Sequence, residues 1–266
     1  GPVEKSYVGY AIDPITRQRA ASGGLVSALL IYMLENRLID GAVVSKIVIE
    51  NGEINARVYI AKTKEEILES RSSIYFDVNI LTALNEMRSF NGKLAVVGLP
   101  WCQLEFLNSI VEKDKLLKNK IFIKIGLFCG HNSNKELLYR VLEKKGIDRN
   151  QIVDFKFRQG KWRGRMHIEM KNGEVIRFPF QHFSVYQNLH FFSLNKCASC
   201  TDHFGRTADI CCGDVWIKSF KNKKYKHSGF FSRNEEGTKI LDSMIADGWI
   251  HAEQVDKKLI FNSQRR

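Results

Sequence analysis

Two nearly continuous apolar segments constrain the fold most strongly. They span residues 93–99 and 121–128, and each is followed by apolar residues at helical spacing, over 104–111 and 135–144. A strand that is apolar on both faces is typical of a sheet covered by helices on both sides. The sequence therefore predicts a mixed α/β fold, with a central mixed sheet and flanking helices.

The dipeptide Asn-Gly occurs twice between pairs of β-rich segments. It lies at residues 51–52 and again at 172–173. Asn-Gly supplies the positive φ angles that a two-residue hairpin turn requires. We therefore expect antiparallel β-hairpins in addition to the central sheet. The paired segments are residues 42–49 with 54–61, and residues 166–170 with 175–180.

Two further segments have the pattern of amphipathic helices. Apolar residues between 25 and 34 recur at helical spacing, and Ser22 stands where a helix cap is expected. Residues 235–247 place their apolar side chains on one face, and Gly248 follows them as a typical helix terminator. Both segments are predicted to be helices that pack on the sheet.

The signals for export and membrane insertion bear on how the cysteines are interpreted. No apolar run reaches the roughly 18 residues that a membrane-spanning helix needs. The first 20 residues contain no apolar segment of the kind found in secretory signals. We therefore expect a cytoplasmic protein without a membrane span. In that compartment, cysteines are expected to be thiols or metal ligands rather than disulfides.

Four of the six cysteines have positions that suggest metal binding. Cys197 and Cys200 form a C-x-x-C pair, a spacing that lets two thiolates bind the same metal ion or cluster. Cys102 and Cys129 follow the two apolar strands, where α/β sheets build their sites. Each of these two cysteines is either a further ligand or a small buried apolar residue.

The remaining cysteines, Cys211 and Cys212, are adjacent in the sequence. Their side chains diverge in an extended chain, so one of them is expected to serve packing. A zinc site made of Cys197, Cys200, His203 and one of this pair is chemically feasible. It matches no common zinc spacing, however.

The chain carries a strong positive charge. Its 41 Lys and Arg residues outnumber 29 Asp and Glu residues, which gives a net charge of +12 and favours an anionic partner. The basic segment 218–226 contains Phe220 and Tyr225, a mixture found in nucleic-acid-binding loops and also in ordinary solvated loops. Together with a zinc site, this segment defines one alternative hypothesis, a non-redox zinc-containing nucleic-acid-binding module.

The tripeptide Ser22-Gly23-Gly24 precedes the first long predicted helix. Glycines let the backbone approach a ligand closely, and the free N–H groups of a helix start favour an anion. The same tripeptide also fits an ordinary capped helix after a tight turn. The residues alone leave both interpretations open.

Taken in order along the chain, these segments resemble the coenzyme F420 hydrogenase/dehydrogenase beta-subunit family, a group of flavin and iron–sulfur reductases. The resemblance extends from about residue 7 to 250. It rests on Ala-Ser-Gly-Gly at 21–24, Ile-Asp-Gly-Ala-Val-Val at 39–44, Ser73 and Tyr75, Val-Val-Gly-Leu-Pro at 96–100 with Cys102-Gln103, Phe-Cys-Gly at 128–130, Phe157-Arg158 with Trp162, Cys197 to Asp202, Ala208-Asp209-Ile210, and Gly213-Asp214 with Trp216.

The resemblance implies an oxidoreductase of the F420-dependent type that contains FAD and a 4Fe-4S cluster. Electrons would pass between the reduced deazaflavin coenzyme F420, or a similar anionic redox substrate, and a ferredoxin or redox partner subunit. Nucleic acid is then not expected as a partner. A reductase of another conjugated ring substrate is the alternative within the family.

The resemblance also implies where these groups bind, with the flavin as the reactive group and no catalytic side chain assigned. We expect an N-terminal α/β flavin-binding part at residues 1–150 and a C-terminal part at residues 151–266, which holds a hairpin, the cysteine-rich segment and a terminal helix. The implied cluster ligands are Cys102, Cys129, Cys197 and Cys200. The implied cofactor-binding residues are Ser22, Gly23, Gly24, Ser73, Tyr75, His131, Arg158, Asp209 and Asp214.

The sequence departs from the family pattern in two places. The family usually has Pro-Cys-Gln, but here Trp101 stands between Pro100 and Cys102. Either the loop is one residue longer or the thiol is displaced, in which case Cys212 is the substitute ligand nearest in sequence to the C-x-x-C pair. Many members also carry a ferredoxin-like cysteine series near the N-terminus, and none precedes Tyr7. Either electrons pass to a separate protein, or the sequence is a piece of a longer chain that carries this series.

Overall fold

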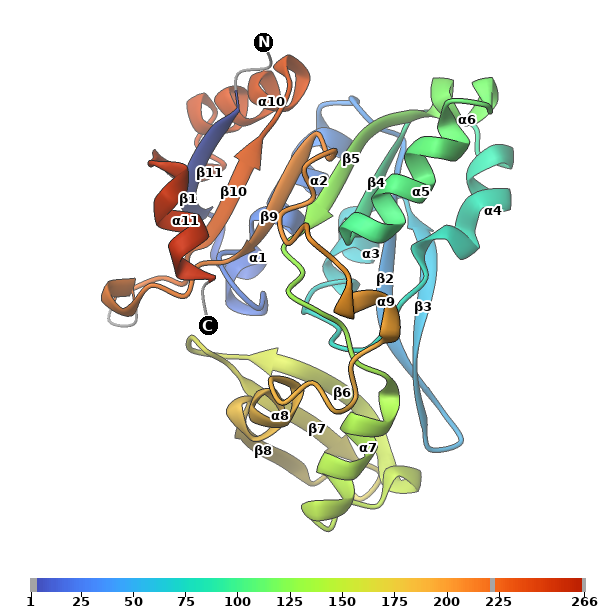
Figure 1. The fold of residues 1–266 in the computed structure, drawn as a ribbon, viewed down its shortest axis with the longest axis vertical. Coiled ribbons are helices and arrows are strands. Elements are labelled where there is room, and N and C mark those ends of the chain that lie inside the picture. Colours follow the sequence, from blue (N-terminus) through green and yellow to red (C-terminus); the bar gives the residue numbers. More distant parts are fainter. Residues whose placement is uncertain (1–3, 221–222, 265–266) are drawn as a thin grey trace.

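The computed structural model describes residues 4–220 and 223–264. This part of the chain contains an eight-stranded mixed sheet and a three-stranded antiparallel sheet, with helices packed against both (Figure 1). The predicted mixed α/β fold is confirmed. None of the helices found in these residues is long and apolar enough to cross a membrane.

The large sheet has the strand order β11-β1-β10-β9-β5-β4-β2-β3. Its central strands are parallel, with β2 beside β4, β4 beside β5, and β5 beside β9, whereas the other neighbours are antiparallel. The carboxyl ends of β4, β5 and β9 therefore lie at one edge of the sheet. The strands are β1 (Lys5–Ala11), β2 (Gly41–Glu50), β3 (Glu53–Ala61), β4 (Leu94–Leu99), β5 (Ile121–Leu127), β9 (Ile210–Asp214), β10 (Ser228–Ser232) and β11 (Ile250–Gln254).

Helices cover both faces of the large sheet, as the doubly apolar strands predicted. Along β4, Ala95 and Val97 belong to the core under one set of helices, while Leu94 and Val96 belong to the core on the opposite face. The first set is α2 (Leu25–Glu35), α3 (Lys64–Glu69) and α10 (Glu235–Ala246). The second set is α4 (Leu84–Ser89), α5 (Trp101–Val111) and α6 (Lys115–Lys120).

The small sheet consists of β6 (Ile152–Gln159), β7 (Arg165–Met170) and β8 (Val175–Pro179). It lies beyond the edge of the large sheet at which β5 ends (Figure 1). Helices α7 (Lys135–Lys144) and α8 (Gln181–Gln187) share an apolar core with it. The short α9 (Asn195–Ala198) follows in the segment that returns to the large sheet. The remaining helices are α1 (Pro14–Gln18) and α11 (Lys257–Ser263), together with 3-10 turns at Ile80–Ala83, Arg149–Gln151 and Lys218–Phe220.

Both predicted hairpins are present. The β2–β3 turn contains Asn51 at φ 51° and Gly52 at φ 75°, as a turn with two positive φ angles requires. The β7–β8 turn contains Gly173 at φ 84°. The β2–β3 turn has two residues, as predicted, whereas the β7–β8 turn is longer, because Glu169 is the residue that pairs with Val175.

The chain leaves the large sheet at the end of β5, and the expected boundary between residues 150 and 151 falls later, between α7 and β6, both of which belong to the core of the small sheet. The chain then returns and adds β9, β10 and β11 to the large sheet, beside β5 and β1. Both expected parts of the sequence therefore contribute strands to the same sheet. The small sheet and its helices form an insertion between β5 and β9 of the large sheet.

Candidate functional site

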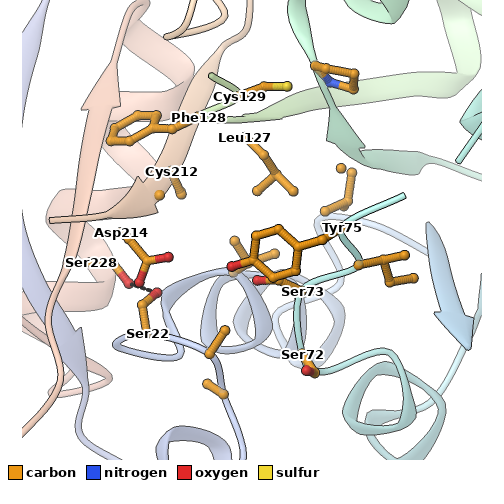
Figure 2. Close-up of a pocket in the computed structure, with 18 of the residues that line it drawn as sticks. Ser22, Ser72, Ser73, Tyr75, Leu127, Phe128, Cys129, Cys212, Asp214 and Ser228 are labelled. Atoms are coloured by element: carbon orange, nitrogen blue, oxygen red, sulfur yellow. Dashed lines mark hydrogen bonds between the residues drawn. The ribbon is translucent and has the colours of Figure 1, made fainter. Parts of the chain in front are cut away.

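A cavity of about 340 Å³ opens at the carboxyl edge of the parallel strands. Open α/β sheets generally bind ligands at this edge. The cavity walls come from the loop before α2, from residues 70–76, and from the segments that follow β4, β5 and β9 (Figure 2). Ser228 and Gln264 complete the lining from the C-terminal region.

The start of α2 faces this cavity. The helix begins at Leu25, and Gly24 precedes it with φ 77° and no side-chain cap. The predicted cap at Ser22 is therefore wrong, because the Ser22 hydroxyl instead pairs with the Ser228 hydroxyl at 2.9 Å (Figure 2). Residues 25–27, the first turn of the helix, line the cavity. An uncapped helix N-terminus of this kind favours a negatively charged group.

Gly23 contributes to the site through packing rather than through its amide. Its N–H donates to the Ser228 hydroxyl at 3.0 Å, and its carbonyl accepts from the Ala11 N–H at 2.8 Å. A Cβ atom at this position would lie 2.7 Å from the carbonyl oxygen of Gly9. The expectation that the Gly23 amide faces a ligand is therefore not met. Only glycine fits between β1 and β10 here.

Three of the predicted residues form a buried polar group at the cavity wall. The Arg158 guanidinium, which is 0% exposed, donates to the Tyr75 hydroxyl at 2.9 Å and forms a two-pronged ion pair with Asp214. Tyr75, Asp214 and the nearby Ser73 line the cavity. Burial lowers the pKa of Arg158, but the Asp214 carboxylate outweighs this and holds the pKa above its usual value. The charged form is therefore maintained despite burial.

Asp209 supports the core instead of the cavity. Its carboxylate accepts from the Lys124 backbone N–H at 2.6 Å and from the Asn234 side-chain amide at 2.6 Å. Asn234 is in turn the N-cap of α10. Asp209 thus joins β5 to the start of α10, and the prediction that it binds a cofactor is not supported by this geometry.

His131 lies where the cavity adjoins the cysteine-rich region. It lines the cavity, and its Nε2 atom is 2.9 Å from the Gln187 carbonyl oxygen. Its ring centroid is 4.1 Å from that of His190, just beyond α8. The residue is therefore held by contacts to the segment that leads to α9.

The four cysteines predicted as ligands come together beside the cavity. Cys102 is the second residue of α5, Cys129 follows β5, Cys197 lies in α9 and Cys200 follows it. All four are half-buried thiols. Burial raises the pKa of Cys129 to about 12, and the other three thiols add to the rise because their charges would repel one another. Because their charges act on one another's pKa, we refer to these four thiols as the four-cysteine set.

Backbone contacts tie the cysteine-bearing segments to one another. The Cys129 N–H donates to the His203 carbonyl at 2.9 Å, and the Asn132 N–H lies 3.4 Å from the Cys197 sulfur. The inserted Trp101 is accommodated as the first residue of α5. Cys102 is the next residue of this helix, and burial together with the charges of Cys197 and Cys200 raises its pKa against the opposing Lys196 charge.

Cys211 and Cys212 occupy opposite faces of β9. Cys211 packs in the core beneath α5, and Cys212 packs in the core beneath α2. Cys212 also lines the cavity, and it is 2% exposed. Burial raises its pKa, and its charged neighbours are Cys211 and Arg233 rather than the four-cysteine set. Both thiols thus serve packing, where the sequence led us to expect this of one.

The thiols do not form a compact site for a single ion. Among residues 4–220 and 223–264, no three His, Cys, Asp or Glu side chains are grouped so that they could hold a metal ion. A zinc site that includes His203 therefore has no support. Ligands of a 4Fe-4S cluster bind four different irons and lie farther apart than ligands of one ion.

The basic segment contains one residue that the sequence did not single out. Lys226 is partly buried and donates to the carbonyl of Ala20, a residue that lines the cavity. Burial lowers its pKa to about 8, with Arg158 and Arg17 contributing. Lys223 and Lys224 instead extend over neighbouring aromatic rings, and Lys221 lies outside the described residues.

This fold and site define a class: mixed α/β proteins with a ligand cavity at the carboxyl edge of the sheet and a cysteine set beside it. Models of the N-terminal and C-terminal regions of the coenzyme F420 hydrogenase/dehydrogenase beta subunit match residues 6–85 and 91–258. The chain belongs to this family, as the sequence resemblance predicted.

Similar proteins include relatives from Methanocaldococcus jannaschii and Methanococcus voltae. An uncharacterized protein of Methanocaldococcus jannaschii is 28% identical over 251 residues, covering 91% of this chain and 64% of the relative. The coenzyme F420 hydrogenase subunit beta of Methanococcus voltae is 26% identical, covering 92% of this chain and 82% of the relative. The coenzyme F420-dependent sulfite reductase of M. jannaschii is 29% identical and covers 96% of this chain, but the chain spans only 38% of that protein.

A solved structure has the same fold. A chain of the F420-reducing [NiFe] hydrogenase complex from Methanosarcina barkeri superimposes with a TM-score of 0.74 and 23% sequence identity. The alignment covers 99% of this chain and 89% of that one. The large sheet and its insertion are therefore shared almost throughout.

Proposed function

We propose that this chain is an F420-dependent oxidoreductase that holds FAD in the cavity and a 4Fe-4S cluster at Cys102, Cys129, Cys197 and Cys200. It would pass electrons between the reduced deazaflavin coenzyme and a ferredoxin or a partner subunit. One observation carries the proposal: Cys129 lines the cavity and also belongs to the four-cysteine set. Two redox groups bound at these places would be immediate neighbours.

The chemistry of the cavity fits a flavin dinucleotide. The uncapped start of α2 suits a phosphate, and the same cavity also has apolar walls, such as Leu30 and Val97, suited to a flat ring. Bound flavin supplies the exchange between a two-electron hydride and single electrons. The chain itself would bind the flavin, orient it and exclude water from it.

The thiol set fits a cluster with a positive iron core. Burial opposes a negative charge on Cys102 and Cys129, and neighbouring thiolates would add repulsion. Iron at the centre of the set would stabilise the thiolates. Lys196, anchored to Asp77 at 3.0 Å, adds a fixed positive charge that favours the ionised thiols.

The proposal that coenzyme F420 is the electron donor rests on the relatives and on the sequence. Several relatives have coenzyme F420 in their names. The chain lacks the G-x-G-x-x-G sequence typical of nicotinamide-binding sites. The net charge of +12 suits an anionic coenzyme and an acidic partner protein.

The proposal is tested on protein purified without oxygen. We expect about one flavin and about four irons per chain, the iron count following from one cubane with four thiolate ligands. Reduced F420 should bleach the flavin absorbance within seconds, whereas NADH should act slowly or not at all. A colourless protein with one zinc per chain would refute the assignment. Rapid bleaching by NADH alone would refute the choice of donor.

A further inference from the structure

Arg158 lies outside the cavity and connects two residues that line it. Tyr75 and Asp214 line the cavity (Figure 2). Arg158 binds both of them and is not part of the lining. The three residues come from different parts of the fold: the loop after α3, strand β6 and the end of β9. Arg158 would therefore contact a bound molecule through the two residues that it holds rather than directly.

The position of Arg158 is held on every side. Its Nε atom donates to the Arg163 carbonyl at 2.8 Å, and its guanidinium carbon lies 5.4 Å from the Phe180 ring centre and 5.3 Å from that of Trp216. Contact with aromatic faces is favourable for a guanidinium. A side chain with so many contacts cannot turn away, so the Tyr75 hydroxyl meets a fixed donor.

The hydrogen-bond chemistry of this contact fixes what Tyr75 offers to a ligand. Arg has donors but no acceptor, so the Tyr75 oxygen must accept from Arg158. The hydroxyl proton of Tyr75 is then directed away from Arg158. In Figure 2 the hydroxyl points across the cavity, toward the side where Asp214 and Ser22 lie. The proton is thus presented to whatever occupies that space.

Two features keep Tyr75 a neutral donor. Burial raises the pKa of Tyr75 above its usual value, and the Asp214 charge adds to the rise against the opposing effects of Arg158 and Ser73. The positive charge of Arg158 is meanwhile matched by Asp214 at 3.1 Å. This wall therefore offers a hydrogen-bond donor without a net positive charge, which suits an uncharged acceptor such as a ring carbonyl or ring nitrogen.

We propose that Arg158 is a positioning residue, which orients the Tyr75 hydroxyl as a hydrogen-bond donor to an uncharged acceptor atom on the planar ring bound in the cavity. This inference rests on the proposed function, because FAD provides that ring. Tyr75 is the residue that touches the ring. Arg158 and Asp214 set its direction.

The experiment compares two substitutions that each remove only a hydroxyl. Tyr75→Phe keeps the aromatic ring, whose centroid lies 4.7 Å from that of the Phe180 ring. Tyr32→Phe is the matched control, because its hydroxyl binds Asp247 at 2.8 Å, away from the cavity. FAD is titrated into flavin-free protein, and both the dissociation constant and the visible absorption spectrum of the bound flavin are recorded.

We expect Tyr75→Phe to weaken FAD binding by roughly threefold to tenfold, as the loss of one hydrogen bond implies. The absorption maxima of the bound flavin should shift as well, whereas Tyr32→Phe should change neither quantity. An unchanged dissociation constant and spectrum in Tyr75→Phe would overturn the inference and leave the proposed function intact. Failure of the wild-type chain to bind FAD would instead overturn the proposed function.

The role of Arg158 is separated from simple support of the fold by a double-mutant cycle. Arg158→Lys retains the charge but loses the two-pronged geometry. If Arg158 acts through Tyr75, then Tyr75→Phe should cost much less FAD affinity in the Arg158→Lys background than in the wild type. Equal costs in the two backgrounds, measured on folded protein, would assign Arg158 a structural role only.

Discussion

The cavity wall and the cysteine set lie side by side but are held in different ways. Hydrogen bonds between side chains hold the cavity wall together, because Arg158 donates to both Tyr75 and Asp214. The sulfur contacts in the cysteine set are longer, such as 3.6 Å from Cys200 to the Asp202 carbonyl, and ionised thiols would repel one another. The protein therefore builds the wall by itself, whereas the cysteine set, in the proposed function, depends on the cluster that it would bind.

The largest effect is expected in the cysteine set. Cys129→Ser should lower the iron content from about four per chain to less than one, because a cubane needs four thiolates. Cys211→Ser is the matched control and should leave the iron content unchanged, because Cys211 is buried in the core of β9. Iron and labile sulfide are measured without oxygen.

The same measurement decides the fourth ligand. Cys102→Ser should also lose the iron, whereas Cys212→Ser should retain it. The opposite result would mean that Trp101 displaces Cys102 after all and that Cys212 takes its place. It would also show that the thiol set seen here is not the one that binds iron.

The next largest effect is expected for Arg158, which holds the cavity wall together. Arg158→Met leaves the Asp214 carboxylate without its partner at a site where the pair is mostly buried. We expect the free energy of unfolding to fall by about 3–5 kcal/mol, the usual cost of breaking a buried ion pair. Denaturant titration measures it. A loss below about 1 kcal/mol would mean that the wall is not built by this pair.

A moderate effect is expected at Asp209. Its substitution tests whether this residue supports the core or belongs to the cavity. Asp209→Ala leaves the Lys124 N–H and the Asn234 amide without their acceptor. The free energy of unfolding should fall by about 1–3 kcal/mol. The FAD dissociation constant of the folded variant should stay within twofold of the wild type. A tenfold weaker affinity would restore Asp209 to the cofactor site.

The smallest effect is expected at Lys226 and depends on pH. Burial lowers its pKa from 10.5 to about 8, so between these values the unfolded chain binds more protons than the folded chain. The contribution of Lys226 to stability therefore rises as the pH increases from about 8 to about 10. Lys226→Met should be more stable than the wild type at pH 7, and this advantage should shrink by pH 10.

Lys224→Met is the matched control for this prediction, because Lys224 is exposed. Its stability difference from the wild type should be the same at both pH values. Denaturant titrations of the three proteins at pH 7 and pH 10 give the comparison. An advantage of Lys226→Met that does not change with pH would contradict the lowered pKa.

The sequence predicted the features that depend on residues close together in the chain. Apolar strands followed by helices located β4 and β5, and with them the strand-end positions of Cys102 and Cys129. It could not predict contacts between residues that are remote in the chain. Arg158 meets Tyr75 across 83 positions, and Asp209 meets Lys124 across 85 positions. Family patterns placed both acidic residues at the cofactor, and only the folded structure separates Asp214 from Asp209.

Residues from early and late parts of the chain close the cavity together. The cavity can therefore form only late in synthesis. Ser22 and Ser228 are 206 positions apart, and Gln264 donates to the Asp214 carbonyl at 2.7 Å. A ribosome makes the chain from the N-terminus, so the loop before α2 emerges long before the strand that completes its wall. A nascent chain that ends before residue 228 has no finished compartment for a bound molecule. A molecule that binds in this cavity would therefore enter it late, after most of the chain has been translated.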